Sequence, residues 1–233
     1  MGSGSRIPVY VEKGKRRAFA GALDWPGWCR SGRDEDSALE ALAAYGRRYE
    51  RALGRVASGL KPPGDASAFE VADRLRGDAT TDFGAPSRPP KVDRLPLDDA
   101  EAKRQGAILK AAWRAFDAAA ERAEGMELRR GPRGGGRDLE AIVRHVMEAD
   151  RAYLGKLGGS HRTPGPDGDA GLRVAILDLL AARARGEPPP RTPRSGSLWS
   201  PRYFVRRSAW HALDHAWEIE DRATSNGSAG RGQ

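Results

Sequence analysis

The 233-residue sequence contains a single cysteine, Cys29, four histidines and three methionines. One cysteine excludes a disulfide bond within a single chain, and nothing in the sequence indicates an oxidising compartment. No apolar run approaches the roughly 18 residues that a membrane-spanning helix requires. The first five residues, MGSGS, lack the apolar stretch of a signal peptide. The sequence therefore predicts a soluble, cytoplasmic protein with no membrane contact.

Positive charge is in excess, but the basic residues do not form continuous runs. The chain carries 40 Lys and Arg against 32 Asp and Glu, a formal net charge of +8. Such a basic balance often indicates nucleic-acid binding. Here the arginines are interleaved with acidic residues in most segments, which is typical of a solvated surface. We therefore expect no nucleic-acid partner.

The first part of the chain has the pattern of a small α+β unit. Apolar residues alternate along residues 6–12, which predicts a strand, and residues 17–23 form a second candidate strand after a tight turn. Pro26 to Cys29 interrupts the second strand. Ser37 can then cap a helix over residues 38–53. Residues 68–74 alternate weakly and predict a further strand of the same sheet.

From Asp98 onward the pattern changes to helical spacing. Residues 76–96 are rich in Gly, Pro, Asp and Thr, and we interpret them as a linker or as an ordered loop that covers a site. Four long helices with breaks between them favour a four-helix bundle. We therefore predict an α+β chain with a small unit at 1–75, a bundle at 97–222 and a disordered tail at 223–233. The predicted helices cover residues 98–124, 137–156, 169–184 and 200–222.

The N-terminal unit resembles the HicB-like β-β-α module. The resemblance rests on the Glu12-Lys13-Gly14 turn, the run LDWPGWC over residues 23–29, and the acidic helix start DEDSALEA over residues 34–41. The resemblance covers roughly the first quarter of the chain. It implies the fold of that module but not its role, because neither a toxin partner nor a DNA-binding helix-turn-helix accompanies it. Cys29 is then expected to be a small buried apolar residue rather than a nucleophile.

Two of the four histidines, His211 and His215, lie four residues apart on the last predicted helix. Residues at this spacing share a helix face, with Cβ atoms ~5–6 Å apart, so both imidazoles could bind one metal ion. Hydrogen-bonded structural histidines explain such a pair equally well. A third histidine, His145, lies at the margin of the apolar side of helix 137–156. His161 falls in a predicted surface loop and is left out of the site.

Taken together, the helix order, His145 and the His211-x-x-x-His215 pair resemble the DinB-like superfamily of four-helix-bundle metalloproteins. The resemblance covers residues ~97–222 and implies that these three histidines hold one divalent metal ion. The superfamily includes thiol-dependent transferases and isomerases. The N-terminal β-containing unit is a departure from its ordinary members.

Three further residues are candidates for catalytic roles. Glu148 follows His145 by one turn and Glu218 follows His215 by one turn, so either could orient a ligand or act as a general base. Arg207 precedes His211 by one turn and could bind an anionic substrate. Exposed helix carboxylates, and for Arg207 an ordinary salt bridge, explain these residues equally well.

The resemblance implies an enzyme that transfers a low-molecular-weight thiol to a small-molecule electrophile, or a hydrolase that uses activated water. Zinc, nickel or iron would suit the three imidazoles, and the sequence does not distinguish them. The Trp-rich last helix could support a homodimer. The alternative is a non-catalytic binding or stress-response module that the metal stabilises, in which the β unit recruits a protein or RNA partner.

Overall fold

Strands occupy the beginning of the chain and long helices the rest, which confirms the predicted α+β class. The structure, a computed structural model, describes residues 6–130, 136–161, 168–193 and 196–223. The predicted disordered tail therefore lies outside the described residues except for Ala223, which forms an antiparallel bridge with Leu128.

Four strands form one sheet in the order β3-β2-β1-β4. The hairpin of β1 (Ile7–Lys13) and β2 (Ala18–Ala22) is the predicted one, and its turn is closed by a hydrogen bond from the Gly14 amide to the Arg17 carbonyl. β4 (Phe69–Arg76) is the further strand predicted from the alternation of residues 68–74, and it pairs parallel to β1.

A third strand, β3 (Cys29–Gly32), was not predicted and pairs antiparallel with β2. The prediction ended the second strand at Pro26 and placed no strand directly after it, because proline and glycine usually mark turns. That turn is real, with Gly27 at φ +93°, but the chain re-enters the sheet directly after it. The unit is therefore β-β-β-α-α-β rather than β-β-α-β.

The predicted helix 38–53 is divided into α1 (Glu35–Ala44) and α2 (Gly46–Leu53) at Tyr45. Its predicted cap was also wrong: Asp34 is the N-cap, and Ser37 completes a capping box with it. Both side chains satisfy backbone amides that the first helical turn leaves unpaired.

The sheet is covered on both faces, which explains why every residue of β2 is buried. α1 packs on one face, and Trp210 of α7 (Pro201–Arg222) packs on the other against Tyr10, Phe19 and Cys29. Gly21 is required there, because a Cβ at this position would lie 2.4 Å from the Tyr10 ring.

Residues 77–98 form an ordered connection that includes the short helix α3 (Ala79–Phe83) and the 3₁₀ turn η3 (Lys91–Arg94). Glu12 is fully buried on β1 and accepts hydrogen bonds from the Thr81 hydroxyl and from the backbone amides of Ser87 and Arg88. A buried carboxylate needs such donors, so Glu12 holds the connection against the sheet.

The four long helices end within two residues of their predicted bounds. Their starts are set by side-chain caps such as Asp98 and Asp138, each of which accepts a hydrogen bond from an amide of the first turn. Gly158 ends the second of them in the left-handed conformation. The helices are α4 (Asp99–Arg122), α5 (Leu139–Leu157), α6 (Gly168–Ala184) and α7.

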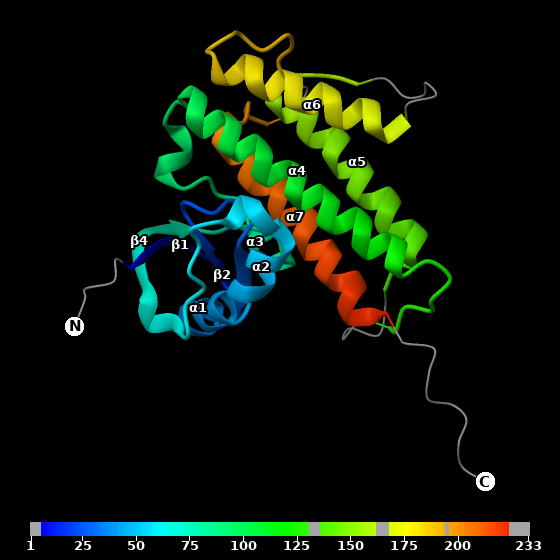
Figure 1. Ribbon diagram of the computed structural model, residues 1–233. Helices are drawn as coiled ribbons and strands as arrows, with labels where there is room; N and C mark the ends of the chain where they lie inside the picture. Colours follow the sequence, from blue (N-terminus) through cyan, green and yellow to red (C-terminus); the bar gives the residue numbers. More distant parts are fainter. Residues whose placement is uncertain (1–5, 131–135, 162–167, 194–195, 224–233) are drawn as a thin grey trace.

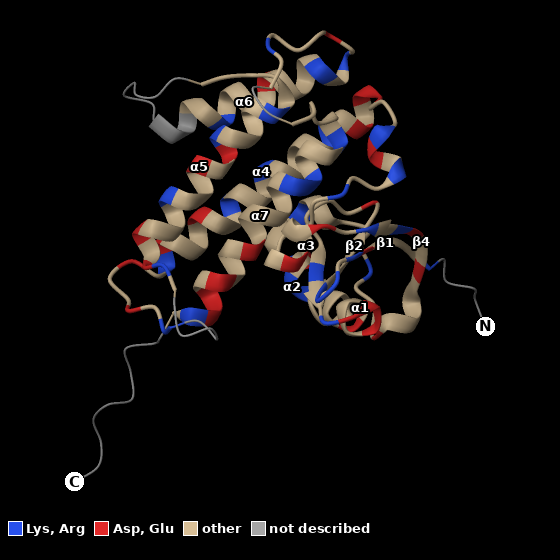
Figure 2. Ribbon diagram, turned by 180° about the vertical axis from the view of Figure 1, so that it is seen from behind, with Lys and Arg blue, Asp and Glu red and all other residues tan. Residues whose placement is uncertain are grey.

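α4 and α7 run side by side through the middle of the molecule, with the sheet, α1 and α2 on one side and α5 and α6 on the other (Figure 1). We refer to the sheet together with α1 and α2 as the sheet unit. α7 therefore contacts the sheet unit, α4 and α5 at once, and 14 of its 22 residues are buried. Basic and acidic residues are interleaved over the ribbon (Figure 2). Among the described helices, none combines the length and apolar character needed to cross a membrane.

One buried ion pair joins the two sides of the chain. The Arg206 guanidinium on α7 binds both carboxylate oxygens of Asp93, at 2.7 and 2.8 Å, and donates to the carbonyls of Ala22 and Leu23. Arg206 is 4% exposed and Asp93 is fully buried. The pair therefore fixes α7 against the end of β2 and against η3.

We predict that Asp93→Ala destabilises the protein by about 3–5 kcal/mol, because it leaves a buried guanidinium without its counter-charge. Denaturant unfolding followed by circular dichroism measures the change. The control is Arg122→Ala, which removes an exposed ion pair with Glu220 and should cost less than about 1 kcal/mol. Equal losses in both variants would contradict this role for the pair.

Candidate metal centre

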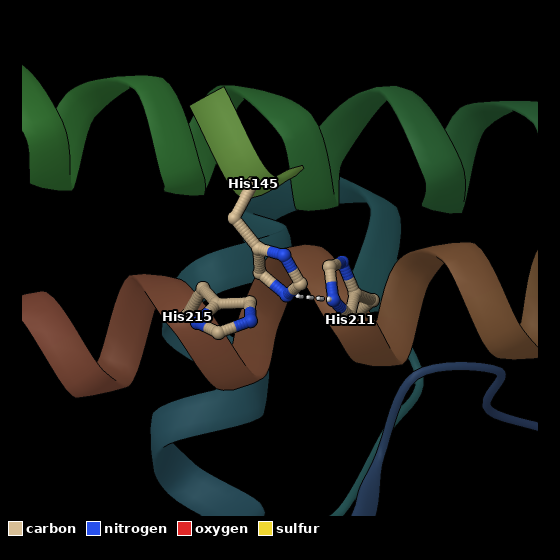
Figure 3. A group of neighbouring side chains, drawn as sticks. All are labelled: His145, His211 and His215. Carbon is tan, nitrogen blue, oxygen red and sulfur yellow. Dashed lines mark hydrogen bonds between the residues drawn. The ribbon is translucent and has the colours of Figure 1, made fainter. Parts of the chain in front are cut away.

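Three imidazoles from two helices converge between α5 and α7 (Figure 3). His145 comes from α5 and reaches across to His211 and His215, which lie one turn apart on α7. One nitrogen from each ring lies within 4.8 Å of one nitrogen from each of the others. The Nε2 atoms of His145 and His211 are 3.3 Å apart. The structure thus brings together the three histidines that the sequence singled out.

The donor set and its spacing fit a divalent ion. Two nitrogen ligands on one tetrahedral zinc ion, each at about 2.0–2.1 Å, are about 3.3 Å apart. The distance from His145 Nε2 to His211 Nε2 equals this value. The same distance also permits a hydrogen bond between the two rings when one of these nitrogens carries a proton. Among the described residues, this triad is the one cluster of His, Cys, Asp and Glu with metal-ligand spacing.

A hydrogen-bonded chain of side chains orients His215. Its Nδ1 lies 2.7 Å from Oε2 of Glu218, and Oε1 of Glu218 accepts a hydrogen bond of 2.6 Å from Arg222. Because an ionised carboxylate only accepts, Nδ1 of His215 donates, and the lone pair of the neutral ring is then on Nε2. Arg222 also donates to the backbone carbonyls of Arg129 and Arg137, which both lie in the connection between α4 and α5.

The surroundings of the triad favour neutral imidazoles. Burial, followed by the charges of His215 and Arg207, lowers the pKa of His211 well below its ordinary value. Burial and Arg137 lower the pKa of His145. Metal ions bind the neutral form of imidazole, so these shifts keep two rings in the ligand state near pH 7. The pKa of Glu218 is lowered by its hydrogen bond to His215, which keeps this carboxylate ionised.

Arg207 lies beside the triad but is not in a salt bridge with any described residue. Its guanidinium carbon is 4.5 Å from the centre of the Trp210 ring and 5.3 Å from that of Tyr153. Tyr153 in turn packs edge-on to His211, at 5.7 Å between ring centres. The position of Arg207 favours a role in holding aromatic rings and in disfavouring protonation of His211.

Glu148 and His161 stay outside the cluster. Glu148 is exposed, and no hydrogen bond or ion pair of the described structure joins it to the triad. It acts on His145 only through its charge, which opposes the lowering of the pKa of that ring. His161 belongs to the loop after α5, away from the triad as predicted.

Two features of the site could not be found by helical periodicity. Tyr153 is one apolar-side residue among many on α5, and only the packing shows that it contacts His211. Trp210 and Trp217, which suggested a homodimer, are 5% and 2% exposed within one chain. They pack against the sheet and the α1–α2 corner within one chain, and the homodimer stays a prediction.

Comparisons with protein families, with curated proteins and with solved structures find no match to this chain. The assignment of a function therefore depends on the residues themselves.

Cys29 is a buried thiol, as expected from its sequence context. It is 1% exposed, and the Tyr10 hydroxyl lies 3.6 Å from its sulfur. Burial is the main reason that its pKa rises to about 12. A thiol in this state is a poor nucleophile, because the thiolate is the reactive form.

We predict that Cys29 reacts with a disulfide reagent at least about 100-fold more slowly in the folded protein than in the denatured chain. At about pH 8 a thiol of pKa about 12 is roughly one part in 10⁴ thiolate, against about a quarter for an exposed cysteine. Absorbance of the released thiolate measures both rates. Equal rates in the two states would show that Cys29 is accessible.

Proposed function

We propose that this chain is a divalent-metal-dependent enzyme with a DinB-like four-helix bundle formed by α4 to α7. Its reaction is the transfer of a low-molecular-weight thiol to a small electrophile, with hydrolysis as the close variant. The observation that supports it best is the convergence of His145, His211 and His215, whose ligand nitrogens lie within 4.8 Å of one another.

The number of protein ligands favours catalysis over a purely structural metal. Structural zinc sites usually have four protein ligands, whereas catalytic sites have three and keep a position for water or substrate. When bound, a divalent ion supplies Lewis acidity that lowers the pKa of a coordinated thiol or water. The described cluster offers three imidazoles.

The residues around the triad have positioning roles in this proposal. Glu218 holds Nδ1 of His215, so that Nε2 is directed to the site, and Arg222 holds Glu218. Arg207 disfavours protonation of His211. In the reaction the thiolate sulfur forms a bond to the electrophilic carbon, the bond to the leaving group breaks, and the thiol proton passes to solvent.

We expect about one divalent ion per chain after incubation with zinc and desalting, measured by elemental analysis. His211→Ala should lower the content close to zero, because two imidazoles bind a divalent ion much more weakly than three. The matched control is His161→Ala, which removes a histidine outside the triad and should keep the full content. Equal zinc in both variants, or a wild-type chain that binds none, would refute the metal site.

A second test addresses the chemistry. The zinc-loaded protein should accelerate the reaction of cysteine or glutathione with 1-chloro-2,4-dinitrobenzene, in which a C–S bond forms and chloride leaves. His211→Ala should lose at least about 100-fold of this rate, followed by absorbance, since it removes the proposed Lewis acid. A loaded protein that is inactive with these and other common thiols would contradict transferase activity. It would favour the binding or stress-response module, with the β unit as the partner-binding part.

A further inference from the structure

A cleft of about 570 Å³ lies between the sheet unit and α7, beside the histidine triad. One wall is formed by β2 and β3 with the residues next to them, a second by Phe83 and Gly84 at the end of α3, and the third by α7. His215 belongs both to this lining and to the triad. The N-terminal unit, a departure from ordinary DinB-like proteins, thus forms part of the space next to the proposed metal.

Most of the charged groups that line the cleft neutralise one another. Each of the three carboxylates on the α7 wall is bound to an arginine at 2.6 to 2.8 Å. These pairs leave little free charge for a ligand. The pairs are Asp214 with Arg30, Glu218 with Arg222 and Asp221 with Arg48.

Arg17 is the exception among the charged residues of this lining. No carboxylate of the described structure lies within ion-pair distance of its guanidinium, and the one hydrogen bond of this side chain to a described residue is a long contact of 3.4 Å from Nη1 to the Ser31 hydroxyl. Gly84 lies opposite the guanidinium, with φ +124°, and a Cβ there would be 3.7 Å from Nη1. A half-buried cation that lines a cleft and has unused donors is suited to an anionic group.

Aromatic rings form the rest of the walls. Phe19 and Trp210 pack edge to face, with 6.1 Å between ring centres, and Trp217 lies two turns beyond Trp210 on the same side of α7. Phe83 is 81% exposed at the cleft, which is unusual for a phenylalanine. These rings favour a ligand with an apolar or aromatic body.

We propose that the cleft binds a small organic carboxylate with an aromatic body, and that Arg17 is the residue that binds the carboxylate. The proposal rests on the proposed function, because it makes this carboxylate the class of substrate that approaches the metal at His215. The volume suits it, since small-molecule pockets are usually about 300–1,000 Å³. The sheet unit then selects the substrate, and the helices hold the metal.

The test uses phenylacetate and its neutral analogue phenylacetamide as probes of the full chain, with binding followed by ligand-observed NMR. Wild type should bind phenylacetate more tightly than phenylacetamide. Arg17→Gln should weaken phenylacetate binding by at least about tenfold, because it removes a charge-assisted hydrogen bond, and should leave phenylacetamide binding unchanged. The matched control is Arg16→Gln, which removes an exposed neighbouring charge outside the cleft and should change binding less than about twofold.

Equal binding of the two probes, or equal effects of Arg17→Gln and Arg16→Gln, would overturn the proposal. Should Arg17→Gln fail to fold, Arg17→Lys keeps the charge but loses the planar fork, and its binding should be several-fold weaker. The zinc content of each variant distinguishes a failure of the carboxylate site from a failure of the metal centre. Normal zinc with no effect of Arg17 refutes the carboxylate site alone, whereas Arg17-dependent binding in a chain that holds no zinc refutes the metal centre alone.

Discussion

The buried ion pair between Arg206 and Asp93 is the constraint on which the arrangement of this molecule depends. A guanidinium enclosed by protein must have its charge and donors satisfied, and here the partners come from η3 and from the end of β2. α7 is therefore fixed against the sheet unit at this residue. His211 and His215 lie further along the same helix, so their distance from the sheet unit follows from the same contact. The cleft beside His215 exists because the Arg206–Asp93 pair sets the separation between α7 and the sheet unit.

α7 presents a different surface to each of its neighbours. The side that faces the sheet carries Trp210, which closes over Phe19, while the side that faces α5 carries the two histidines. The polar side chains that follow the histidines along α7 have partners. Glu218 binds His215 and Arg222, and Arg222 also donates to backbone carbonyls of the α4–α5 connection. Polar groups at this end of the helix can be enclosed in this way because His215, Glu218 and Arg222 each have a partner. The same chain of contacts that stabilises the helix end also orients a candidate metal ligand.

The sequence predicted the elements whose residues carry a local signal. Helical spacing located the four long helices to within two residues, alternation located β1 and β4, and β2 was predicted as the second strand of a hairpin. β3 was missed because four residues after a Pro-Gly turn carry too little periodicity, and the division at Tyr45 was missed because the apolar spacing continues through it. The three histidines were found because two share a helix face and the third completes a known pattern. Arg17, Asp93 and Tyr153 could not be found, since their roles arise from contacts between residues far apart in the chain.

The proposed function requires that one ion binds all three imidazoles. X-ray absorption at the zinc edge of the zinc-loaded protein tests it directly, because imidazole rings give a recognisable multiple-scattering pattern. We predict three imidazole nitrogens at about 2.0–2.1 Å, with the remaining coordination completed by oxygen ligands. A first shell without imidazole, or one that contains the sulfur of Cys29, would contradict it.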